Sequence, residues 1–192
     1  MFFEPLPPEP APTPRRWAAP LWDRPSEGTI PAVVAVNEVI VRTEQVVVAL
    51  ELVRVYTNGF TLGLVALANP QDDDEESWSF FGLGGRGARG DRSFPRLGIR
   101  FADGRTAGRH SAWHPDARDD RGMPTEPIVR MVNAGGGGSG GMRANFWAHP
   151  LPPPGPLDIV VGLPGLDDLE RVVTLDADRI ISASHEARVI WE

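Results

Sequence analysis

Residues 46–67 read VVVALELVRVYTNGFTLGLVAL, and this stretch decides the fold class. Two runs rich in Val and Leu, 46–56 and 60–68, lie on either side of the dipeptide Asn58-Gly59. β-Branched residues favour strands, and Asn-Gly accepts the positive φ angles of a two-residue type I′ turn. The stretch therefore predicts a β-hairpin with its turn at Asn58-Gly59.

This turn position also predicts a register for the hairpin. It places Val55 opposite Leu62 and Val53 opposite Leu64. The alternation of apolar and polar residues slips near Leu52-Val53, where neighbouring positions are both apolar. A β-bulge, or burial of both faces of the strand, would explain this slip.

The rest of the chain contains further short apolar or alternating runs between Gly- and Pro-rich turns. They predict strands at 33–41, 77–81, 96–101, 127–133, 142–148, 157–162 and 171–175. Residues 176–188 predict one short helix with Asp176 or Asp178 as its N-cap. Many short strands at near-regular spacing favour an all-β fold, an antiparallel two-sheet sandwich. The predicted sandwich is immunoglobulin-like only in the layering of its sheets, since the Cys-Trp-Cys hallmark of immunoglobulin domains is missing. A β-barrel with a lid helix is the alternative.

The sequence divides into an arm and one folded domain. Prolines recur through residues 1–31, which predicts an extended Pro-rich N-terminal arm, and residues 32–192 form the β-sandwich domain. The tract 134–141 is almost all glycine, which predicts a flexible hairpin tip. Trp17 and Trp22 would be an apolar liability in a solvated arm. We therefore expect the arm to lie on the domain or on a partner.

Two residue types are absent, and their absence excludes several chemistries. All 19 basic side chains are arginine, and there is no cysteine. A Schiff-base or P-loop lysine, a thiol nucleophile, a thiolate metal site and a disulfide are all ruled out. The net charge of −7 opposes general binding to nucleic acid or to an anionic membrane. With no secretory signal and no apolar span of membrane length, the chain is expected to be soluble and cytoplasmic.

The first functional hypothesis is a non-enzymatic protein-interaction or structural module whose partner is another protein. Recognition would fall to the N-terminal arm and to loops 82–93 and 108–126, because loops on a rigid scaffold carry function. The expected contact residues are Trp17, Trp22, Arg86, Arg89, Arg92 and Trp113. An RNA contact by the Gly/Arg-rich loop is a weaker alternative. No cofactor and no catalytic residue is predicted.

The second functional hypothesis is a small-ligand, sugar or metal-binding protein, or an enzyme of that kind. It rests on His110, His114 and Asp116, whose imidazole and carboxylate groups are metal-ligand types close together in sequence. Aromatic residues bracket the strands and offer a platform on which a sugar could stack. They are Tyr56, Phe60, Trp147 and Trp191.

Two motifs carry a resemblance to other proteins. They are the segment 55–60, Val-Tyr-x-Asn-Gly-Phe, and the glycine run 135–141 followed by Phe146-Trp147-Ala-His-Pro150. Together with the Trp near the C-terminus, they resemble a family of uncharacterised, single-domain β-rich proteins of high-GC (actinobacterial) bacteria. The resemblance implies one compact domain and adds no catalytic assignment.

Overall fold

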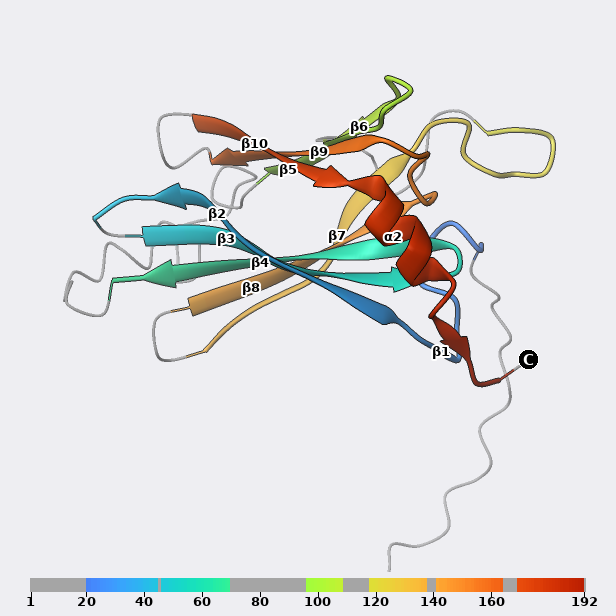
Figure 1. Cartoon of the computed structure of the whole chain (residues 1–192), viewed down its shortest axis with the longest axis horizontal. Coiled ribbons are helices and arrows are strands. Elements are labelled where there is room, and N and C mark those ends of the chain that lie inside the picture. The colour runs from blue at the N-terminus through green and yellow to red at the C-terminus, as the bar shows by residue number, and fades with distance from the viewer. Residues whose placement is uncertain are drawn as a thin grey trace, which may run out of the picture.

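The computed structural model describes residues 20–44, 46–69, 96–108, 118–137, 141–163 and 169–191. Within these ranges the chain is mostly β, with antiparallel sheets and one short helix (Figure 1). The predicted strand at 77–81 lies outside the described residues.

The strands, in chain order, are β1 (Thr29–Ile30), β2 (Ala32–Arg42), β3 (Val46–Tyr56), β4 (Gly59–Ala68), β5 (Arg96–Arg100), β6 (Thr106–Gly108), β7 (Ile128–Gly137), β8 (Gly141–His149), β9 (Pro156–Leu163), β10 (Leu169–Asp176) and β11 (Arg188–Val189). The helix α2 spans Ala177–Ser184. The predicted strands that fall within the described ranges are all confirmed, and no bound is shifted by more than four residues.

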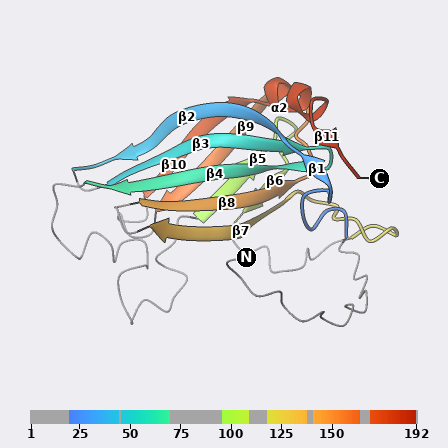
Figure 2. The same ribbon diagram turned by 90° about the horizontal axis from the view of Figure 1, so that it is seen from below.

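The strands form three antiparallel sheets. One has five strands in the order β2-β3-β4-β8-β7, one has four in the order β10-β9-β5-β6, and β1 pairs with β11 in a two-stranded ribbon. Figure 2 shows the five-stranded sheet in front of the four-stranded sheet. One apolar core joins them, with Val48, Leu50 and Leu62 from the first sheet and Ile99 and Ile159 from the second. Removing this apolar surface from water stabilises the pair of sheets.

The hairpin is confirmed, but the predicted turn position is wrong. Tyr56 pairs with Gly59 and Val55 pairs with Phe60, so Thr57 and Asn58 are the turn residues. Neither Asn58 nor Gly59 is among the described residues with positive φ. Gly59 belongs to the strand instead, because β8 approaches it too closely for any side chain: a Cβ added there would lie 2.4 Å from the Ala148 carbonyl oxygen.

The irregularity predicted near Leu52 is confirmed. The pairing of β3 with β4 shifts register between Leu50 and Leu52, which marks a β-bulge or irregularity there. β4 is also buried on both faces from Gly59 through Ala66. The irregularity therefore accounts for the slip in β3, whose residues alternate between buried and partly buried on either side of it, whereas burial of both faces is found in the partner strand β4.

The predicted helix is real but shorter than expected. The Asp176 carboxylate accepts a hydrogen bond from the Asp178 N–H at 3.0 Å, which confirms Asp176 as the N-cap. Ala177, Ile180 and Ala183 turn into the core. The helix ends at Ser184 rather than at residue 188, because Arg188–Val189 pairs with β1 instead.

The glycine-rich tract also differs from its predicted form. The strand β7 continues to Gly137 and β8 begins at Gly141, so most of the predicted flexible tip belongs to the ladder. Main-chain hydrogen bonding does not depend on a side chain, and glycine can therefore continue a strand despite its higher entropy cost. Residues 138–140 lie outside the described ranges.

Candidate functional site

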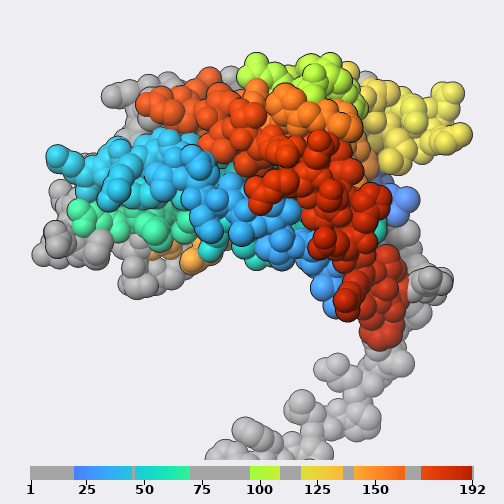
Figure 3. Space-filling view, viewed as in Figure 1, coloured from blue at the N-terminus to red at the C-terminus, as the bar shows by residue number. Residues whose placement is uncertain are grey.

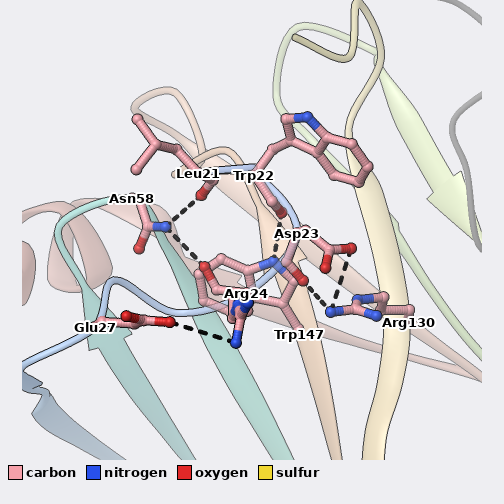
Figure 4. A network of polar contacts seen from close by, with 8 residues as sticks. All are labelled: Leu21, Trp22, Asp23, Arg24, Glu27, Asn58, Arg130 and Trp147. Atoms are coloured by element: carbon pink, nitrogen blue, oxygen red, sulfur yellow. Dashed lines mark hydrogen bonds and ion pairs between the residues drawn. The ribbon is translucent and has the colours of Figure 1, made fainter. Parts of the chain in front are cut away.

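Residues 20–28 of the expected arm lie on the domain beside the turn of the hairpin β3–β4, where β7 begins and β8 ends. Aromatic and polar contacts hold them there (Figure 4). We call this set the N-terminal clamp, and its main members are Trp22, Asn58, Arg130 and Trp147. The sequence predicts that the arm lies on the domain or on a partner. Residues 20–28 confirm the first of these, because they contact the domain.

Two tryptophans form the apolar half of the clamp. Trp147 is fully buried and donates its indole N–H to the Trp22 carbonyl oxygen at 2.8 Å. Trp22 is 3% exposed and donates its own indole N–H to the Gly122 carbonyl oxygen at 3.1 Å. The Tyr56 ring meets Trp147 edge to face, with centroids 5.9 Å apart, and the Arg118 guanidinium lies over Trp22. Trp22 was expected to contact a partner, but its indole is covered by this chain.

Asn58 forms the centre of the polar half. Its Nδ2 donates to the carbonyl oxygens of Leu21 at 2.5 Å and Arg24 at 2.9 Å. Its Oδ1 accepts a hydrogen bond from the Ser26 N–H at 3.0 Å. One side chain thus satisfies three main-chain groups of a segment more than 30 residues away in sequence. This role explains why Asn58 sits in the turn without adopting the conformation of an Asn-Gly type I′ turn.

An ion pair completes the clamp. The Arg130 Nη2 lies 3.4 Å from the Asp23 carboxylate and also donates to the Asp23 carbonyl oxygen. Both side chains are about one-quarter exposed. Nearer the solvent, Arg24 and Glu27 pair at 3.4 Å. Exposed pairs contribute little stability, so the Trp22–Trp147 contact and the Asn58 hydrogen bonds hold the segment.

His149 lies beneath the clamp. It is 9% exposed, and its Nδ1 lies 2.6 Å from the Asn58 carbonyl oxygen, a position from which a neutral imidazole donates its Nδ1–H. Burial lowers the pKa of His149 from its ordinary value of 6.5, and the Asn58 hydrogen bond opposes this only in part. The imidazole is thus kept neutral beside the residue that anchors the arm.

The lowered pKa of His149 predicts a loss of stability in mild acid. Above pH 6.5 the imidazole is neutral in both the folded and unfolded states. Below that pH the unfolded chain binds a proton that the folded chain resists, so the free energy of unfolding falls as the pH falls. The Asp103 and Asp158 carboxyls, whose pKa values are lowered from 3.8 by hydrogen bonds, contribute at lower pH. Urea unfolding measured from about pH 7 to about pH 5 should show this slope.

His149→Asn should flatten that slope, because the amide cannot titrate and can still donate to the Asn58 carbonyl. The exposed His185 provides the matched control, and His185→Asn should retain the wild-type slope. Equal slopes for wild type and His149→Asn would contradict this account.

The ribbon β1–β11 lies at one end of the molecule (Figure 2), and it exposes apolar side chains. Thr29 pairs with Val189 and Ile30 with Arg188, and the Ile190 N–H donates to the Gly28 carbonyl oxygen at 2.7 Å. Because ladder partners share a face and neighbours alternate, Ile30 and Val189 lie on opposite faces of the ribbon. We call the exposed residues of this segment the apolar ribbon. They are Ile30 (56% exposed), Val189 (51%), Ile190 (46%) and Trp191 (76%).

The indole of Trp191 lies against the backbone at Gly28. A Cβ added to Gly28 would lie 2.8 Å from the Trp191 Cδ1, and Gly28 has a φ of +68°. Glycine at this position therefore allows both the turn into β1 and the approach of the indole. The contact orients a side chain that is otherwise open to solvent.

Most of the residues predicted from the sequence as functional lie outside the described residues. These are Trp17, Arg86, Arg89, Arg92, His110, Trp113, His114 and Asp116. All of the loop 82–93 lies outside as well. Residues 118–126 are described, and they form a turn in which Arg118 and Pro124 pair in an isolated antiparallel β-bridge. Among the described side chains, no three His, Asp or Glu residues gather closely enough to hold a metal ion.

The aromatic platform suggested for a sugar is wrong for two of its four members. Phe60 and Trp147 are fully buried, so neither ring has a face open for stacking. Tyr56 is partly buried against Trp147, and Trp191 is the well-exposed ring of the four.

Sequence reasoning missed Asn58 and His149 as parts of the clamp, and Ile30, Val189 and Ile190 as a surface. The position of Asn58 in a hairpin turn marks it in the sequence, but an Asn in a turn is equally explained by the local conformation of the turn itself. His149 has no such mark, since its partner is a main-chain carbonyl 91 residues away. The exposure of the ribbon follows from which segments pair, and a single sequence does not show that pairing.

No helix in the described part of the chain is both long enough and apolar enough to cross a bilayer. Comparison with protein-family models, with curated proteins and with solved structures finds no match.

Proposed function

We propose that the protein is a non-enzymatic interaction module that uses its apolar ribbon to bind another protein. The β-sandwich, immunoglobulin-like in its layering, would serve as a rigid scaffold. The single observation that supports this proposal is the exposure of Ile30, Val189, Ile190 and Trp191 together on one two-stranded ribbon. Exposed apolar side chains gathered on one short segment, here on both of its faces, typically mark an interaction site in a soluble protein.

The chemistry of the ribbon fits recognition of a protein. Tryptophan is enriched among the residues that dominate binding energy, because its large rigid ring buries much area at low entropy cost. Trp191 is exposed, and its side chain lies beside the backbone at Gly28. The clamp also anchors residues 20–28, which lead directly into β1. A ribbon held at both strands loses less entropy on binding than a free tail would.

The arm and the loops extend this proposal. Residues 1–19, the loop 82–93 and the part of the loop 108–126 that lies outside the described residues remain predicted contact regions. Arg86, Arg89 and Arg92 would add charge-assisted hydrogen bonds to an acidic partner.

Comparative capture from lysate tests the role of the ribbon. The full chain and the variant Ile190→Ser/Trp191→Ser should be used as bait, with quantitative mass spectrometry of cross-linked partners. We expect at least one protein whose capture falls about tenfold in the variant. The control is Val172→Ser, which removes an apolar side chain of similar exposure, 52%, from β10. If every captured protein responds equally to the two variants, the ribbon is not the docking surface.

A further inference from the structure

An open groove of about 450 Å³ lies between β2 and α2. Val33, Val34 and Ala35 form one wall, and the α2 segment that carries Asp178, Ser182 and Glu186 forms the other. Figure 3 shows the red surface of α2 lying along the blue surface of β2. The groove shares no residue with the apolar ribbon.

The polar wall follows from the amphipathic sequence of α2. Ala177, Ile180 and Ala183 turn into the core, which leaves Asp178, Ser182 and Glu186 exposed. Asp178 and Ser182 are four apart within α2, and Glu186 lies two residues past its end, in a turn whose Glu186 N–H donates to the Ala183 carbonyl oxygen at 3.0 Å. If the turn after Ser184 keeps roughly the helical rise of 1.5 Å per residue, the backbone positions of Asp178 and Glu186 are about 12 Å apart along the axis.

The other wall is an exposed part of an edge strand. β2 is the first strand of the five-stranded sheet and, among the described strands, pairs only with β3. Val33 is 60% exposed, and Ala35 is exposed on the same face two residues later. The Arg179 Nη2 donates to the Ala35 carbonyl oxygen at 3.4 Å, which directs this guanidinium toward the main chain of β2. The wall therefore offers two small apolar contacts about 6.6 Å apart.

The groove is negatively charged. Of the described residues that line it, Asp176, Asp178 and Glu186 are acidic and Arg179 alone is cationic. Asp176 uses its carboxylate as the helix N-cap. Within the described residues, no ion pair involves Asp178 or Glu186. These two carboxylates are thus available to a cationic ligand, and a deficit of positive charge in the groove favours one.

From this geometry we infer that the groove binds an extended basic peptide segment of a protein partner. In an extended chain, residues i and i+4 lie about 13 Å apart and point to the same side. Cationic side chains at those positions would match the spacing of Asp178 and Glu186. Apolar side chains at i+1 and i+3 would point to the opposite side and meet Val33 and Ala35.

The probe is the peptide acetyl-Lys-Val-Ser-Val-Lys-amide, titrated to about 1 mM into the ¹⁵N-labelled full chain. We expect saturable amide shifts in residues 33–35 and 177–186. The peptide acetyl-Lys-Lys-Ser-Val-Val-amide has the same composition but breaks the alternation, and it should bind about fivefold more weakly. Spermine is the third ligand, because it carries spaced cations and no apolar side chain. No shifts in the groove, or equal affinity for all three ligands, would overturn the inference.

A pair of double variants tests the charges. Asp178→Asn/Glu186→Gln should weaken the first peptide about fivefold, as expected for two exposed ion pairs. Glu126→Gln/Glu170→Gln removes the same net charge at exposed positions outside the groove and should leave the affinity unchanged. Equal weakening in both variants would mean general attraction to an acidic protein and would overturn the site. Circular dichroism of each variant confirms that it is folded.

The outcome is separable from that of the proposed function. Ile190→Ser/Trp191→Ser leaves every groove residue in place, so the first peptide should bind it with wild-type affinity. Loss of binding there would overturn the groove as the peptide site, whatever proteins the ribbon captures.

Discussion

Trp147→Ala should lower the free energy of unfolding by about 4 kcal/mol, within the range for loss of a buried Trp or Phe ring. The ring is fully buried, packs edge to face on Tyr56, and carries the N–H that donates to the Trp22 carbonyl oxygen. Its removal leaves a cavity and an unpaired buried carbonyl, and each adds to the lost transfer free energy. Since domains of this size have about 5–15 kcal/mol of stability in total, the variant should be only marginally folded.

Urea unfolding of the full chain measures this effect, with Trp191→Ala as the matched control. The control deletes the same side chain where it is 76% exposed, so its stability should change by less than about 0.5 kcal/mol. Trp147→Phe should fall between the two, because it retains a buried ring and loses the N–H donor. If Trp147→Ala is as stable as Trp191→Ala, the two rings do not differ in burial as described.

The apolar pattern predicted the strands because their signal is local. Residues 46–56 and 60–68 alternate or run apolar over the length of a strand, and both lie in strands of nearly those bounds. The N-cap of α2 was predicted for the same reason: an Asp at the start of an apolar period of 3.6 satisfies a free N–H two residues later. Each of these signals needs only a few neighbouring residues.

The turn was misplaced because a distant contact overrides the local preference. Asn-Gly favours a type I′ turn when nothing else contacts it. Here the Asn58 amide binds the carbonyls of Leu21 and Arg24, and β8 approaches the Cα of Gly59. Glycine is required at position 59 because two strands pack closely there. A glycine that serves close packing cannot be told, in a single sequence, from one that supplies the positive φ of a turn.

The candidate surfaces were missed for a related reason. Ile30 and Trp191 are 161 positions apart, and only the pairing of β1 with β11 brings them to one ribbon. The groove likewise requires that β2 be an edge strand, which follows from the order of strands in the sheet and not from the composition of β2. Trp22 carried a correct physical signal, that an indole in an arm must be covered. Its ring lies under the Arg118 guanidinium and packs in one buried cluster with Ile128 and Trp147.

Gly59→Ala should be nearly as damaging as the loss of the tryptophan, although it adds only a methyl group. The new Cβ would lie 2.4 Å from the Ala148 carbonyl oxygen and 2.6 Å from the Trp147 Cη2. The carbonyl belongs to the backbone of β8, paired on both sides, and the indole is fully buried, so neither can move away cheaply. Overpacking of this kind costs about 1–3 kcal/mol. We expect a destabilisation at the upper end of this range, because the new methyl group would clash with two rigid groups.

Gly135→Ala is the control for the backbone effect of replacing a strand glycine. Gly135 also lies in an antiparallel strand, but nothing lies within 4 Å of the position its Cβ would occupy. Its replacement should leave the free energy of unfolding within about 0.5 kcal/mol of wild type, or raise it slightly because alanine restricts the unfolded chain. Adding Trp147→Phe to Gly59→Ala should relieve only part of the strain, since the smaller ring removes one clash and the Ala148 carbonyl remains. Full recovery of stability in the double variant would mean that the clash is with the indole alone. Equal stability of Gly59→Ala and Gly135→Ala would contradict the close approach of β8 to β4.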